Sequence, residues 1–281
     1  MKHKYPVSAL CKVLGISRSA YYYRPKALSD DAIDLEIKVR AIFRASRNVY
    51  GARKIKSELE AENIVVSRRR IRAIMKKLHL VSVYTKAKYK HHPSKKNEEQ
   101  IHNALNREFS QRQPLEVIVS DLTYVRIHQR WAYVCAITDL FNREVIGYSC
   151  GLRRDSALIQ EAFDTIPYPL EAIGCFHTDR GKEFDNNHIR ALLKANHIKR
   201  SLSRPGNPYD NAVAENIFKS FKTEFLERET FQSLNDLREK LSSYIQWWNS
   251  ERRHTSLENM TPLAYREREG IKSKPVVRAT P

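Results

Sequence analysis

Residues 117–125 read V-I-V-S-D-L-T-Y-V, a β-rich run that carries a single acidic residue, Asp121. Apolar and β-branched residues in such a run are typical of a strand, so Asp121 is expected within or at the edge of one. Because successive side chains of a strand alternate between its faces, Asp121 and Thr123 share a face. The stretch therefore predicts a sheet that presents a carboxylate from one of its strands.

The sequence that follows predicts the rest of an α/β unit. Strands are expected over residues 130–137 and 144–150, joined by a turn-prone segment. Asp155 is a candidate N-cap for the next helix. A fourth strand is expected over residues 172–178, and Asp179 follows at its end. An acid at the C-terminal end of a strand is a common position for catalytic groups in α/β folds.

A third acidic residue, Glu215, lies on a predicted helix. The turn-rich segment R-P-G-N-P-Y-D precedes it, and Asp210 or Asn211 is expected to begin the helix. Apolar residues then recur at helical spacing and predict a buried stripe formed by Ala214, Ile217, Phe218, Phe221 and Phe225. Glu215 lies beside that stripe, with Lys219 and Lys222 on its own face. The pattern fits a surface Glu–Lys pair, or a carboxylate followed by two ammonium groups that contact DNA phosphates.

These three carboxylates stand in a strongly basic chain. Three converging carboxylates can hold two divalent cations, which activate an attacking oxygen and stabilise the leaving oxygen of a phosphodiester. Mg²⁺ is the expected ion, because carboxylate and phosphate oxygens are hard ligands. The formal net charge of the chain is +18, which favours a polyanionic partner. The predicted catalytic and metal-binding residues of this nucleic-acid enzyme are Asp121, Asp179 and Glu215.

The first hundred residues predict small helical units. Residues 7–14 and 18–24 read as helix, turn and helix, an arrangement that can place its second helix in a DNA groove. A second pair is expected over about residues 52–62 and 68–78, with Ser67 as the N-cap of its later helix. The outer face of that helix is basic and carries Arg68, Arg69, Arg72, Lys76 and Lys77. The three arginines are predicted to bind DNA through phosphates and base edges, and a solvated basic helix is the alternative.

The C-terminal part predicts an amphipathic helix over residues 234–249, after which Arg252 and Arg253 follow. These two arginines are interpreted either as a favourable cationic end of the helix or as contacts to the DNA backbone. His177 shares a face with Asp179 and is predicted to be a core histidine with its hydrogen bonds satisfied. Three tryptophans are interpreted as core rather than as platforms for stacked bases: Trp131, Trp247 and Trp248.

Several classes of protein do not fit the chain. No apolar run approaches the roughly 20 residues of a membrane-spanning helix, and the N-terminus M-K-H-K-Y-P lacks the apolar core of a signal peptide. The four cysteines form no C-x-x-C pair, which favours free thiols in a reducing cytoplasm. The histidines and cysteines of the N-terminal part lack the spacing of a zinc module, so no structural zinc is expected.

The motifs together resemble the transposases of bacterial insertion sequences in the retroviral-integrase superfamily, and more narrowly the OrfB-type catalytic subunit of the insertion sequence three family. That family has a triad with 35 residues between its second and third acids, and the matching positions are Asp121, Asp179 and Glu215. The segment H-T-D-R-G-K-E-F around Asp179 matches the integrase pattern H-T-D-x-G-x-x-F. The family motif Y-N-x-x-R-x-H reads W-N-S-E-R-R-H at residues 248–254, with Trp248 in place of Tyr. Lys219 and Lys222 lie at offsets that match lysines contacting DNA ends in such integrases.

The resemblance implies a fold and a domain order. The fold is an α/β, ribonuclease H-like integrase catalytic core, a mixed sheet with flanking helices, preceded by small all-α helix-turn-helix-like units. The expected divisions are an N-terminal helix-turn-helix-like unit at 1–30, a second helical DNA-binding unit at 31–85, a basic linker at 86–112, the catalytic core at 113–266 and a disordered tail at 267–281.

The resemblance also implies a DNA transposase, a polynucleotidyl transferase in which water cleaves at the element end and the exposed 3′-hydroxyl attacks another phosphodiester. Two Mg²⁺ per active site are expected, with Mn²⁺ as a substitute. The expected partners are double-stranded DNA of the terminal repeats and target, further copies of the chain on DNA, and an upstream-frame OrfA protein, with no membrane. The expected location is the cytoplasm, at the nucleoid. The alternatives are a ribonuclease H-like nuclease that only hydrolyses and a non-catalytic DNA-binding regulator.

Overall fold

A computed structural model of the chain describes residues 5–22, 30–85, 113–203 and 212–270. Three expectations fall wholly or partly outside these residues: the basic linker at 86–112, the first residue of the helix that carries Glu215, and most of the tail at 267–281. Among the described residues, no helix is both long and apolar enough to cross a membrane.

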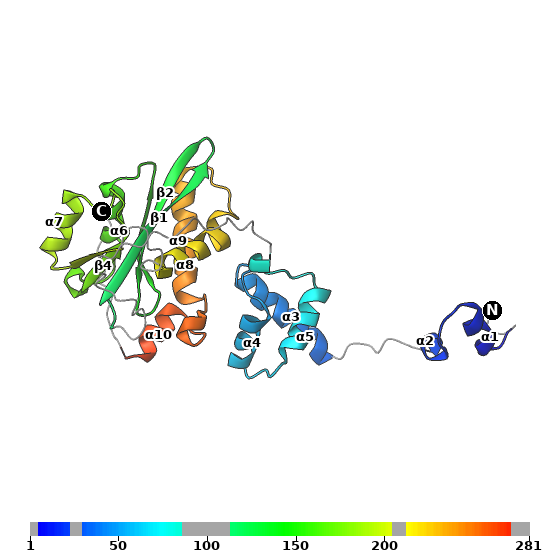
Figure 1. Cartoon of the computed structure of the whole chain (residues 1–281). Helices are drawn as coiled ribbons and strands as arrows, with labels where there is room; N and C mark the ends of the chain where they lie inside the picture. The colour runs from blue at the N-terminus through cyan, green and yellow to red at the C-terminus, as the bar shows by residue number, and fades with distance from the viewer. Residues whose placement is uncertain (1–4, 23–29, 86–112, 204–211, 271–281) are drawn as a thin grey trace, which may run out of the picture.

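A five-stranded mixed sheet forms the centre of the part of the chain after residue 113 (Figure 1), with the strand order β3-β2-β1-β4-β5. The first three strands pair antiparallel, while β4 and β5 run parallel to β1. Their bounds are β1 Val117–Ile127, β2 Arg130–Asp139, β3 Val145–Gly151, β4 Cys175–Thr178 and β5 Lys199–Leu202. The first three predicted strands are confirmed. The fourth is shorter than predicted, because Leu170–Ala172 form a 3-10 turn ahead of it.

Helices cover both faces of this sheet (Figure 1). One apolar cluster joins the sheet to α6 and α7, and another joins its opposite face to α8 and α9. The bounds are α6 Ser156–Asp164, α7 Asn187–Ala195, α8 Ala212–Phe221, α9 Leu234–Ser250 and α10 Pro262–Arg268. Asp155 caps α6 as predicted, its carboxylate accepting a hydrogen bond from the amide of Leu158 at 3.2 Å. This architecture is the predicted ribonuclease H-like fold.

Among the residues described before the sheet, the α-helices are α1 Val7–Val13, α2 Arg18–Tyr22, α3 Asp30–Ala45, α4 Ala52–Ala61 and α5 Arg68–Lys77. The Ser67 hydroxyl accepts a hydrogen bond from the amide of Arg70, which confirms the predicted cap of α5. Helix α3 was not predicted, but its residues complete the core of α4 and α5. That core is continuous with the α8–α9 face of the sheet, and the Trp247 indole donates a hydrogen bond to the carbonyl of Ala45 at 3.2 Å.

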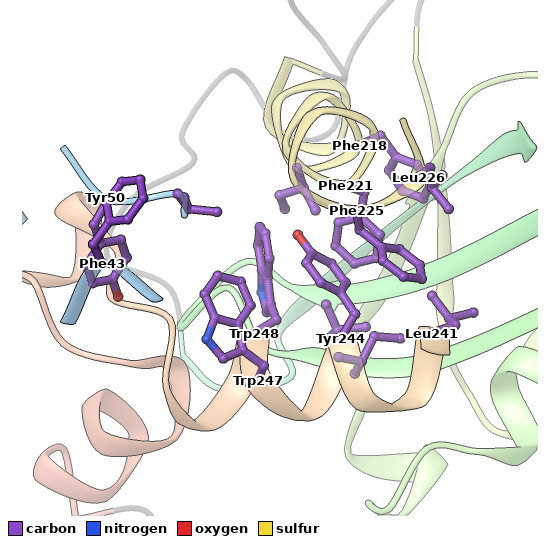
Figure 2. Packing of buried hydrophobic residues seen from close by; sticks show 14 of the residues in the cluster. Phe43, Tyr50, Phe218, Phe221, Phe225, Leu226, Leu241, Tyr244, Trp247 and Trp248 are labelled. Atoms are coloured by element: carbon purple, nitrogen blue, oxygen red, sulfur yellow. The ribbon is translucent and has the colours of Figure 1, made fainter. Parts of the chain in front are cut away.

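Aromatic side chains fill the space between α8, α9 and the sheet, as Figure 2 shows. The rings of Phe225 and Tyr244 stack with centroids 4.7 Å apart, and Phe221 packs on both Tyr244 and Trp248. Helix α8 leads directly into a π-helical turn, η4, at Lys222–Leu226. This turn was not predicted, and it orients Phe225 toward Tyr244 while burying the residue before it, Glu224.

The assignment of Trp131 to the core is wrong. Its side chain is 49% exposed, and its ring packs edge-to-face on Tyr124, which is 61% exposed, with centroids 5.0 Å apart. The paired ends of β1 and β2 extend past the neighbouring strands (Figure 1). One face of this end is exposed and carries Tyr124 and Trp131, while the other buries Val125 and Ile127. Trp247 and Trp248, by contrast, are buried as predicted.

Candidate active site and DNA-binding surface

Two of the predicted catalytic carboxylates are brought together by strand register. The parallel strands β1 and β4 pair only over Val117–Val119, and the last of these pairs joins Val119 to His177. Asp121 and Asp179 each lie two residues beyond that pair. Because the strands run in the same direction and side chains alternate, both carboxylates extend from neighbouring positions past the end of the pairing.

One oxygen of each carboxylate is held by the backbone. Oδ1 of Asp121 accepts a hydrogen bond from the amide of Leu122 at 2.7 Å, and Oδ1 of Asp179 accepts one from the amide of Gly181 at 3.0 Å. Within the described part of the chain, no hydrogen bond to Oδ2 accompanies either. Each acid thus has one anchored oxygen and a second oxygen available to a ligand.

The third carboxylate, Glu215, lies exposed in the first turn of α8. The negative charge of Glu215 acts on Asp121. The pKa of Asp121 is raised from 3.8 to about 6, mainly by burial and also by the negative charges of Asp179 and Glu215, while the hydrogen bond from the Leu122 amide and the ammonium of Lys222 act in the opposite direction. A half-buried acid whose pKa responds to two other acids and a lysine indicates a shared electrostatic site.

The donor chemistry of these acids fits a hard divalent cation, since all three offer carboxylate oxygens. The described residues contain no group of three or more His, Cys, Asp or Glu side chains already close enough to hold a metal ion. The chemical type of the donors, and the absence of any hydrogen bond to the Oδ2 atoms from the described residues, are compatible with a metal site.

His177 is the core histidine that was predicted. It is fully buried, with Nδ1 2.9 Å from the Ser201 hydroxyl and Nε2 3.1 Å from the Ser203 hydroxyl. Glu183, which follows Asp179 by four residues, is also buried and pairs with Arg154. Neither side chain is therefore added to the catalytic carboxylates.

Arg252 and Arg253 both have protein carboxylates as partners. The guanidinium of Arg252 is buried and makes two hydrogen bonds to the carboxylate of Glu224. Arg253 is half-buried and pairs with Glu58 on α4. Contact of these two cations with the DNA backbone stays a prediction. The sequence contained a signal for the Arg252–Glu224 pair. Position 224 falls on the apolar stripe of the helix, three residues after Phe221, where a buried side chain is expected.

The other predicted DNA contacts lie on the surface. Arg68, Arg69 and Arg72 are exposed on α5, and no ion pair joins them to another residue that the structure describes. Lys219 and Lys222 are exposed beyond Glu215. The ammonium of Lys222 lies 5.8 Å from the centre of the Tyr124 ring, next to the strand that carries Asp121.

Known protein families match most of the chain. A model described as an integrase core domain matches residues 111–208, a second with the same description matches residues 196–262, and an HTH-like domain matches residues 29–88. The chain is 30% identical over 270 residues to the putative transposase InsK for insertion sequence element IS150 of Escherichia coli (strain K12), covering 95% of each chain. It belongs to the transposases of bacterial insertion sequences.

This transposase is also 33% identical over 268 residues to the insertion element IS600 uncharacterized 31 kDa protein of Shigella sonnei, covering 92% of this chain and 98% of that one. Among solved structures, the simian T-cell lymphotropic virus intasome aligns over 80% of the transposase and 74% of that chain, with 16% identity and a TM-score of 0.48. The resemblance predicted from the motifs is confirmed. The transposase is a DNA-binding polynucleotidyl transferase with an integrase core and a helix-turn-helix-like domain.

Proposed function

We propose that the transposase cleaves element ends and transfers the resulting 3′-hydroxyl at a site formed by Asp121, Asp179 and Glu215. The observation that carries this proposal is the register of β1 and β4, which sets two acids side by side beyond the Val119–His177 pair. The response of the Asp121 pKa to Asp179 and Glu215 supports the same grouping.

In this proposal the acids bind two Mg²⁺ ions, with Mn²⁺ as a substitute. The bound ions activate the attacking oxygen and stabilise the leaving oxygen of the phosphodiester. The backbone amides of Leu122 and Gly181 hold one oxygen of Asp121 and Asp179, and the second oxygen of each would bind the ions. Glu215 completes the site from α8, and a direct attack on phosphorus needs no Ser or Tyr nucleophile.

In this proposal, DNA contacts two surfaces of the protein. Lys219 and Lys222 hold backbone phosphates next to the acids, while the exposed arginines of α5 bind the terminal repeat: Arg68, Arg69 and Arg72. We keep the domain divisions 1–30, 31–85, 86–112, 113–266 and 267–281 as part of this proposal. Assembly of several copies on DNA, pairing or fusion with an OrfA protein, and action in the cytoplasm at the nucleoid complete it.

The test uses full-length protein and linear DNA that carries both ends of the element flanking the gene. Asp121→Asn, Asp179→Asn and Glu215→Gln should each reduce cleavage and joining below about 1% of wild type, because amides bind divalent cations poorly and the three acids act as a unit. Glu161→Gln, an exposed acid on α6, is the matched control and should retain activity. Full activity in any of the three variants would remove that acid from the site. Cleavage without joined product would favour a nuclease that only hydrolyses.

A further inference from the structure

Two cationic cavities adjoin one another between the catalytic core and the helical unit formed by α3, α4 and α5. The first has a volume of about 450 Å³ and the second about 410 Å³, and both are lined by Lys54 and Thr255. The first extends to α8, where Asn216 and Ser220 line it. The second extends to α5, where Arg68 and Arg72 line it. The cavities therefore connect the arginine face of α5 with the helix that carries Glu215.

The charged residues that line the two cavities are basic. Of the described residues that line the two cavities, none is acidic, whereas the basic ones are Arg53, Lys54, Arg68, Arg72, Arg143 and Arg252. Arg252 is neutralised by Glu224, but that carboxylate lies beneath the guanidinium and is buried. An anion that enters the cavities thus meets cations and polar donors, with no carboxylate among the described lining residues, which favours phosphate oxygens over a neutral ligand.

Lys54 lies at the junction and has no carboxylate partner among the residues that the structure describes. Its ammonium is 5.0 Å from the centre of the Tyr50 ring. The two carboxylates whose charges act on Lys54 are occupied, since Glu224 pairs with Arg252 and Glu58 pairs with Arg253. A half-buried lysine held over an aromatic ring, beside other cations, lacks the neutralising charge that a bound anion would provide.

We propose that these two cavities form a phosphate-binding track, centred on Lys54, that holds the DNA backbone between the arginines of α5 and the catalytic helix α8. This inference rests on the proposed function, in which DNA contacts both ends of the track. The ligand is a series of phosphodiester groups, because a continuous cationic surface that ends at two DNA-binding elements suits a polyanion. The track explains how the helical unit and the active site engage one duplex without a change in their relative position.

The test compares Lys54→Gln with Lys56→Gln, a matched control two residues away whose ammonium pairs with Glu60. Binding of a fluorescein-labelled duplex of about 30 base pairs to the full-length protein is measured by anisotropy, without divalent cations, from about 50 to 200 mM KCl. Lys54→Gln should weaken binding about fivefold to tenfold and reduce the slope of log K against log salt by about one. Lys56→Gln should leave the slope unchanged, and Lys54→Arg should restore it.

A second variant keeps the test decisive if Lys54→Gln does not fold. Ser220→Glu places a carboxylate in the first cavity and should likewise reduce the salt slope. Unchanged slopes in both variants, or equal losses in the Lys56→Gln control, would overturn the track. A wild-type thermal shift in inorganic phosphate that Lys54→Gln abolishes, with an unaltered DNA slope, would assign the cavity to a free anion instead. A change in oligomeric state with unaltered DNA binding would assign it to a protein contact. If the wild-type protein binds no DNA, both the track and the proposed function are wrong.

Discussion

The carboxylate of Glu224 accepts two hydrogen bonds from the guanidinium of Arg252, Nε to Oε2 at 2.8 Å and Nη2 to Oε1 at 2.6 Å. The phenol groups of Tyr84 and Tyr244 donate hydrogen bonds to the same carboxylate. This buried network links the helical unit through Tyr84, the π-helical extension of α8 through Glu224, and the end of α9 through Arg252. The helix that carries Glu215 is thereby tied to the unit that carries the α5 arginines.

Replacing Glu224 by Ala should strongly destabilise the fold. The change leaves the Arg252 charge buried without its partner, and loss of one member of a buried pair costs about 3–5 kcal/mol. The free energy of unfolding in urea is the measurement. Lys38→Ala breaks a pair with Glu62 in which both side chains are about half exposed, and it should cause little change. Equal effects of the two substitutions would contradict a structural role for the buried pair.

Replacing Trp248 or Trp131 by Ala should distinguish a tryptophan of the core from one at the surface. Trp248 is 2% exposed, and its indole donates a hydrogen bond to the Arg143 carbonyl at 3.0 Å, so Trp248→Ala should cost about 3–5 kcal/mol. Trp131 is 49% exposed and packs mainly on Tyr124, so Trp131→Ala should cost about 1 kcal/mol or less. Thermal or urea unfolding compares them directly. A large loss in Trp131→Ala would mean that the end of the β1–β2 hairpin is covered in solution.

Removing either lysine of the catalytic helix should weaken DNA binding more than it weakens the fold. Lys219→Ala and Lys222→Ala should each reduce the salt slope of DNA binding by about one, because each removes one phosphate contact. Lys194→Ala, on α7 against the opposite face of the sheet, controls for the change in net charge. If all three variants behave alike, the two lysines are solvated side chains and contact no phosphate.

DNA binding should also depend on pH through Lys54. Burial and, to a smaller extent, the positive charge of Arg252 lower the pKa of Lys54 from 10.5 to about 8, although the carboxylates of Glu224 and Glu58 act in the opposite direction. The ammonium is therefore charged below about pH 8 and loses its charge as pH rises through that value. The groups that face it are Tyr50, Glu58, Arg143, Glu224, Arg252 and His254.

The wild-type salt slope should accordingly decrease between about pH 7 and pH 9, while that of Lys54→Arg should remain constant, since arginine keeps its charge throughout. Anisotropy titrations at the two pH values provide the measurement. A slope that falls equally in both proteins would show that another group is responsible.

Local sequence patterns predicted those elements whose residues carry their own signal. The β-rich run around Asp121, the capping residues Asp155 and Ser67, and the apolar stripe of α8 each specify structure through neighbours close in sequence. Strand β5, K-R-S-L, was not predicted because it has no apolar run and becomes a strand only by pairing with β4. Helix α3 carries such a signal, since its buried residues Leu35, Val39 and Phe43 recur every four positions, and the prediction missed it.

The sequence by itself determined the chemistry of this transposase: three acids in recognisable contexts, a basic chain and an integrase-type motif order. Only the tertiary structure decided which charges are available to DNA. It buried Arg252 against Glu224, exposed Trp131 on one face of the β1–β2 hairpin, and left Lys54 without an ion-pair partner among the described residues at the junction of two cavities. The physical reason is that exposure and pairing depend on contacts between residues far apart in the chain, such as positions 224 and 252, and no local pattern of residue types encodes those contacts.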